Sequence, residues 1–169
     1  MVDACLELLD LAYFEAQFAL EGLADEHVWK RPAEGLLSIG ELAGHVAYAE
    51  VVRLAGDGLE GERDLTRCHV TSPLVDLRFR YYPATIETEP TAEQRAMTSA
   101  QVWEEWLRVH QAVVAHVRAL SPDPQAAVPG YPPDHTYGEF LKYLVFHVSY
   151  HVGQMYSARH LLGEQPPDN

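Results

Sequence analysis

The sequence predicts an all-α protein, a four-helix bundle in one domain. Four segments carry apolar residues at the three- and four-residue spacing of an amphipathic helix. Three of them begin at Ser or Thr with Glu or Gln three residues later, which is the spacing of a capping box. The 169 residues are 47% hydrophobic, enough for a core of useful size. We therefore expect a single domain over residues 1–169, without an internal repeat.

The first two helices follow from this spacing. The first is predicted from Asp3, a residue type that favours the N-cap, to residues 22–23. The second begins at Ser38, with Glu41 in the capping position, and ends near the "GDG" of residues 56–58. On the first helix, one stripe holds Leu6, Leu9, Asp10, Tyr13, Ala16, Gln17 and Leu20. On the second, one stripe holds Leu42, His45, Val46, Ala49 and Val52.

The third helix is predicted to start at Thr91 or at Thr98, since both fit the capping pattern, and to end at Leu120 before "SPDP". A long irregular stretch, residues 57–90, precedes it, and residues 73–87 within that stretch favour a short strand or an extended strap. A connection of this length allows the second and third helices to run parallel. The stripe of the third helix holds Trp103, Trp106, Leu107, His110, Val113, Val114 and Val117.

The fourth helix is predicted to start at Thr136, with Glu139 in the capping position, and to stop at Gly163. Gly153 lies inside it and costs about 1 kcal/mol relative to alanine, which predicts close packing against another helix. The buried stripe of this helix holds Phe140, Leu144, His147, His151, Met155 and Ala158.

Charge and composition limit the function classes. The formal net charge of −13 disfavours nucleic acid and anionic membrane surfaces as partners. Residues 1–20 contain four acidic side chains and no basic start, so we expect neither a signal peptide nor a membrane span there. The two cysteines, Cys5 and Cys68, form no CxxC motif, which is typical of a reducing compartment. A cytoplasmic protein is therefore predicted.

Histidines lie on the apolar stripes of three predicted helices. Taken singly, each is more often a hydrogen-bonded core residue than a metal ligand. His147 and His151, however, are four residues apart and leave the same face of one helix. Burying two uncompensated imidazoles costs several kcal/mol, roughly, and a divalent metal compensates both. The chain has neither HExxH nor ExxH, so a metal site here would be built from histidines. A third imidazole from a facing helix would leave an open, catalytic type of site.

Two segments, about 100 residues apart, resemble the DinB superfamily. Residues 23–50 resemble the family's entry to its second helix, and residues 147–163 resemble its C-terminal signature of His-x-x-x-His, Gly-Gln, Arg and Gly. The matching residues are Trp29, Arg31, Pro32, Gly35, Ser38, Ile39 and His45 in the first segment, and His147, His151, Gly153, Gln154, Arg159 and Gly163 in the second.

The resemblance implies a bundle in up-down-down-up order with a long crossover between helices two and three. It implies one divalent metal ion per chain, zinc, nickel, iron or manganese, held by His45, His147 and His151, often in a homodimer. Characterised members of the family include transferases that join low-molecular-weight thiols such as bacillithiol, mycothiol or glutathione to electrophiles. No further cofactor is implied.

Several other residues have two interpretations each. His110 either lines the pocket or supplies a fourth ligand, or it is a satisfied core histidine. Gln154 and Arg159 are either pocket groups or polar contacts that stabilise the bundle. Tyr13 and Glu50 are candidates to orient a ligand histidine through its free N–H.

The leading hypothesis is a metal-dependent enzyme that transfers a small thiol to a small electrophile. The metal would lower the pKa of a bound thiol or water and so yield a nucleophile at neutral pH. Two alternatives are a metal-binding protein of a stress response that has no turnover, and a structural dimer with a vestigial site.

Overall fold

The protein is all-helical over the residues that its structure, a computed structural model, describes: 1–56, 65, 68–80 and 89–167. No strand occurs among these residues, so the prediction of an all-α protein is confirmed. No helix among them combines the length and the apolar character needed to cross a bilayer. The helices are α1 Val2–Leu20, α2 Asp25–Val28, α3 Ile39–Leu54, η2 Leu77–Phe79 (a 3-10 helix), α4 Ala92–Arg95, α5 Ser99–Leu120 and α6 Tyr137–Leu161.

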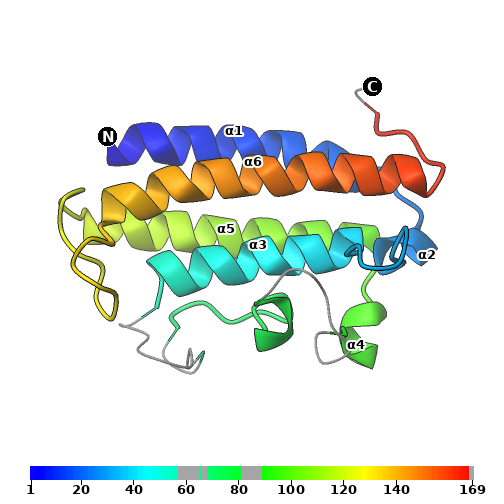
Figure 1. Cartoon of the computed structure of the whole chain (residues 1–169), viewed down its shortest axis with the longest axis horizontal. Coiled ribbons are helices and arrows are strands. Elements are labelled where there is room, and N and C mark those ends of the chain that lie inside the picture. The colour runs from blue at the N-terminus through cyan, green and yellow to red at the C-terminus, as the bar shows by residue number, and fades with distance from the viewer. Residues whose placement is uncertain (57–64, 66–67, 81–88, 168–169) are drawn as a thin grey trace.

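The four long helices lie side by side (Figure 1). Helix α1 packs mainly on α6, and α3 packs on both α5 and α6. In Figure 1, α1 and α6 run in one direction while α3 and α5 run in the other. The connection between α3 and α5 brings the chain back to the end of the molecule at which α3 begins. It includes η2, which packs on α3. The site described below is built where α3, α6 and η2 meet.

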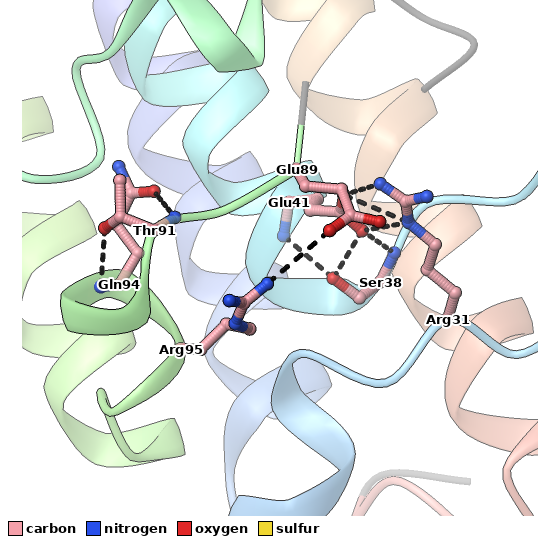
Figure 2. Close-up of polar contacts among 7 residues, drawn as sticks. All are labelled: Arg31, Ser38, Glu41, Glu89, Thr91, Gln94 and Arg95. Atoms are coloured by element: carbon pink, nitrogen blue, oxygen red, sulfur yellow. Dashed lines mark hydrogen bonds and ion pairs between the residues drawn. The ribbon is translucent and has the colours of Figure 1, made fainter. Parts of the chain in front are cut away.

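The start of α3 is held by a buried polar network (Figure 2). The Glu41 backbone N–H donates to Ser38 Oγ over 3.2 Å, and the Ser38 backbone N–H donates to Glu41 Oε2 over 2.8 Å. Arg31 donates from Nη2 to the other oxygen of the Glu41 carboxylate over 2.6 Å. Because the carboxylate is 1% exposed, it requires this set of donors. The predicted capping box is confirmed, and Arg31 completes it.

Both of the alternative starts for the third helix are used. Thr91 and Gln94 form a reciprocal capping box at the start of α4 (Figure 2), and Thr98 and Gln101 form another at the start of α5. Two short-range signals therefore produced two separate helices. Thr136 caps α6, since its Oγ1 accepts from the Glu139 backbone N–H over 3.3 Å. The predicted capping box is only half formed, because the Glu139 carboxylate accepts from Lys142 Nζ over 2.8 Å instead.

The structure corrects several local predictions. Asp3 is not the N-cap of the first helix, because α1 begins at Val2 with Met1 as its N-cap. The backbone at residues 77–79 forms η2 rather than a strand or strap, and residues 81–87 of that prediction lie outside the described residues. Gly153 does not mark close packing, because a Cβ placed there would have no neighbour within 4 Å. The close approach occurs at Gly44 instead, where a Cβ would lie 2.5 Å from the Phe79 ring. Glycine at position 44 thus allows η2 to pack against α3.

The two glycines form a matched pair for a stability test. Gly44→Ala should destabilise the protein by about 1–3 kcal/mol, because the new methyl group overlaps the buried Phe79 ring and outweighs the gain in helix propensity. Gly153→Ala should stabilise it by up to about 1 kcal/mol, because only helix propensity changes there. Urea denaturation followed by circular dichroism measures both. Equal effects at the two positions would contradict the packing described here.

Candidate metal centre

Three histidines from two helices converge at one point. His45 comes from α3, and His147 and His151 come from α6. The Nε2 atom of His147 lies 3.2 Å from Nε2 of His45 and 3.1 Å from Nε2 of His151. If one ring nitrogen is taken from each histidine, the three nitrogens lie within 4.8 Å of one another. The i, i+4 spacing supplies two of the imidazoles, and the packing of α3 on α6 supplies the third.

Hydrogen bonds to the opposite nitrogens direct two of these imidazoles. The carbonyl oxygen of Phe79, which can only accept, lies 2.6 Å from Nδ1 of His45. Nδ1 of His151 lies 2.6 Å from Oε1 of Gln154, whose amide nitrogen donates to the Tyr150 hydroxyl over 3.1 Å. Nδ1 therefore carries the hydrogen in both rings, and Nε2 keeps its lone pair. Metal-ligating imidazoles are oriented in the same way.

All three imidazoles have a lowered pKa. Burial lowers the pKa of His147 to about 2, with further contributions from His151, His45 and the Arg53 charge. Burial and the neighbouring His45 lower the pKa of His151 to about 4. Burial also lowers the pKa of His45, although the Phe79 carbonyl opposes the shift. The rings are therefore neutral at pH 7, which is the form that binds metal.

Lone pairs aimed at one point repel one another unless a proton or a cation lies between them. With two of the Nδ1 atoms committed to acceptors, two of the three Nε2 atoms have no hydrogen to donate. Three neutral imidazole nitrogens suit divalent first-row metals, for which they are common ligands. The residues present thus fit a divalent ion, and the three histidines could hold one.

A cavity of about 390 Å³ opens beside the histidines. One wall comes from α3 and another from α6, and Arg80, the residue that follows η2, also lines it. The cavity is lined by His45, Tyr48, Ala49, Arg53, Arg80, Tyr143, Phe146, His147, Tyr150 and His151. Its size and its aromatic lining suit a small organic molecule.

His110 lies elsewhere, in the core between α1, α3 and α5. Its Nδ1 is 3.1 Å from Glu50 Oε1, its Nε2 is 3.2 Å from Asp10 Oδ1, and its ring stacks on Tyr13. Burial alone would lower the pKa of His110, but the two carboxylates outweigh it and raise the pKa. His110 does not line the cavity, so its contacts are those of a satisfied core histidine. Tyr13 and Glu50 accordingly hold His110 rather than any of the three converging histidines, and Tyr13 donates to Glu50 Oε2 over 2.5 Å.

Gln154 and Arg159 both lie on α6 but make different contacts. Gln154 orients His151, as described above. Arg159 is buried and donates from Nη1 to the carbonyl oxygens of Phe18, in the last turn of α1, and of Glu21, its C-cap residue, at 2.8 and 2.7 Å. It therefore ties α6 to the C-terminal end of α1 and does not line the cavity.

Sequence reasoning missed the roles of Phe79, Arg53 and Arg80. Phe79 acts through its backbone carbonyl, which every residue type offers, so no sequence signal identifies it. Arg53 had a usable signal, because it lies eight residues after His45 and hence on the same face of α3.

Two comparisons with known proteins found a match. A sequence model of the DinB superfamily matches residues 8–155. The crystal structure of a DinB-like protein from Bacillus cereus superimposes with a TM-score of 0.66 at 21% sequence identity, over 98% of this chain and 95% of that one. At this identity the likeness shows a shared fold. A search among curated proteins found no match.

Acid should destabilise the metal-free protein through its histidines. Imidazole has a pKa near 6.5 in the unfolded chain, whereas in the folded chain the pKa is about 4 for His151 and about 2 for His147. Between pH 6.5 and these values the unfolded chain binds more protons, so the free energy of unfolding falls as the pH falls. The raised pKa of His110 acts above pH 6.5 and leaves this window unchanged.

The measurement is urea denaturation of chelator-treated protein at several pH values between 6.5 and 4.5. The His147→Gln variant, which loses one titrating group, should show a slope shallower by up to about 1.4 kcal/mol per pH unit. Parallel slopes for the wild type and the variant would contradict the burial of a neutral imidazole at position 147.

Proposed function

The chain belongs to the DinB superfamily, and on this basis we propose that it is a metal-dependent enzyme in which His45, His147 and His151 hold one divalent ion per chain. The observation that carries the proposal is the convergence of three Nε2 atoms, two of which are directed by hydrogen bonds at Nδ1. Three protein ligands are typical of catalytic sites, which keep a further position for water or substrate.

The proposed reaction joins a small thiol to a small electrophile. When bound, a divalent ion supplies a positive charge that lowers the pKa of a thiol or water. The chain itself supplies the rest. Phe79 and Gln154 keep two rings in the metal-binding tautomer, and burial keeps the rings neutral. Aromatic side chains of α6 line one side of the cavity.

The remaining parts of the proposal come from the family resemblance and from the composition. They are a single domain over residues 1–169, an up-down-down-up bundle order, a homodimer, a cytoplasmic location and no nucleic-acid partner. The net charge of −13 supports the last of these.

Metal content tests the ligand set directly. Protein purified without an affinity tag should contain about one divalent metal ion per chain by elemental analysis. His147→Ala should abolish this, because the central imidazole of the three is lost. His160→Ala is the matched control, since His160 is exposed near the end of α6 and lies outside the cluster. Unchanged metal content in His147→Ala would refute the assignment.

The same assay measures the role of Gln154. Gln154→Leu removes the acceptor for His151 Nδ1 and should weaken metal affinity about 10- to 100-fold. Gln154→Glu keeps an acceptor at that place and should restore most of the affinity.

Activity tests the reaction class. A panel of thiols that includes glutathione and bacillithiol is incubated with a chromogenic aryl halide and the protein. Product formation should require added divalent metal, and His147→Ala should reduce it to the uncatalysed rate. Turnover with none of the thiols, in protein that carries metal, would favour a binding protein without catalysis.

A further inference from the structure

Helix α1 carries a second row of apolar side chains, on the side that faces away from the core. Leu6 and Leu9 are buried, whereas Leu8 and Leu11 are 50% and 56% exposed. Leu8 and Leu11 are three residues apart and so share one side of the helix, and Phe14, three residues further on, is exposed beside them. Single exposed apolar side chains are common, but a row at helical spacing is typical of a side that packs against another surface.

Helix α6, which packs beside α1, extends this apolar surface (Figure 1). Phe146 is 64% exposed, and Tyr150, one turn later on α6, is 51% exposed. The two rings stack on each other, with their centroids 5.9 Å apart. We call the surface formed by these exposed side chains the α1–α6 face; its members are Leu8, Leu11, Phe14, Phe146 and Tyr150.

The apolar area of the α1–α6 face matches what a dimer needs. All five of its residues are at least half exposed, and half of a side chain of this size is on the order of 100 Å². The face therefore exposes about 500 Å² of apolar surface, near the upper end of what a monomer usually exposes in one patch. A standard interface takes about 800 Å² from each partner, and about 60% of that area is apolar, which is again about 500 Å².

The two ends of the face carry opposite charges. Lys142 lies one turn before Phe146 on α6, Glu15 lies one turn after Leu11 on α1, and both are exposed. Because α1 and α6 run in one direction, the two charges lie at opposite ends of the face. A two-fold axis through its middle brings each end of one copy onto the other end of a second copy. Lys142 also contacts Glu139 of its own helix over 2.8 Å, and an ammonium has three hydrogens to donate.

We propose that the α1–α6 face is the interface of a homodimer, in which a two-fold axis pairs Lys142 with Glu15 of the second copy. This inference rests on the homodimer of the proposed function and assigns a surface to it. Phe146 and Tyr150 belong both to the face and to the lining of the cavity. The second copy therefore lies beside the cavity that the three histidines border.

Sedimentation velocity of the untagged protein, over a range of micromolar concentrations, measures the association. The double variant Leu8→Gln, Leu11→Gln should weaken the dimer at least about tenfold, because each leucine is lost from both copies. Leu120→Gln is the matched control, since Leu120 is 47% exposed at the end of α5, outside the face. It should leave the association unchanged. Circular dichroism checks that each variant keeps its helices, as expected for exposed positions at which glutamine replaces leucine.

The two-fold pairing has a test of its own. Glu15→Lys and Lys142→Glu should each weaken the dimer about three- to tenfold, because like charges then meet at both ends of the interface. The double variant should regain nearly the wild-type affinity. Glu15→Lys reduces the negative net charge of each chain, which by itself would favour association. A weaker dimer in this variant would therefore report a local contact.

Each result supports or overturns a stated part of the proposal. A dimer that persists in the leucine double variant would overturn this interface and leave the homodimer standing. Charge variants that are not rescued by their combination would refute the two-fold pairing. A protein that stays monomeric at every concentration would overturn the interface and the homodimer together, and its binding to phosphatidylcholine vesicles would assign the face to a lipid surface instead.

Metal content, measured on the same samples, separates the interface from the metal site. A dissociated variant should keep the metal content of the wild type, because the leucines and the two charged residues lie outside the three histidines. Wild-type protein that forms the dimer but contains no metal would overturn the metal-dependent function and support the interface.

Discussion

The site depends on one constraint, which is that three neutral imidazoles place their nitrogens within 4.8 Å of one another. The arrangement is unfavourable unless the lone pairs share a cation or a proton, so the surrounding contacts must hold the rings in position. The Phe79 carbonyl and the Gln154 amide do this for His45 and His151. The close approach of η2 to α3 at Gly44 is what places that carbonyl. A loop that is distant in sequence thus belongs to the site.

The molecule uses buried histidine in two opposite ways. Near the cavity, burial and other imidazoles lower the pKa of His147, so that it is neutral and able to accept a cation. In the core, the carboxylates of Glu50 and Asp10 raise the pKa of His110, so that it pairs with acids. Both environments border α3, because His45 and Glu50 project from different faces of that helix. One residue type therefore forms a candidate metal site on one side of α3 and supports helix packing on the other.

The charged side chains that line the cavity are opposite in sign to the net charge of the whole chain. The overall net charge is −13, whereas the charged side chains that line the cavity are Arg53 and Arg80. A small anion would be attracted by these two residues at short range, where screening by salt is weakest.

Local sequence determined the elements of this protein. Capping signals at Ser38, Thr91 and Thr98 each started a helix, and the four-residue spacing placed His147 and His151 on one face. The choice of the third imidazole did not follow from the pattern, since His45 and His110 both lie on apolar stripes. Tertiary structure decided between His45 and His110, because the rotation of each helix about its own axis determines which of its side chains face the neighbouring helix. Contacts between distant segments likewise determine three other features, which are the position of the Phe79 carbonyl, the arginines of the cavity and the open surroundings of Gly153. Residue spacing within one helix does not encode such contacts.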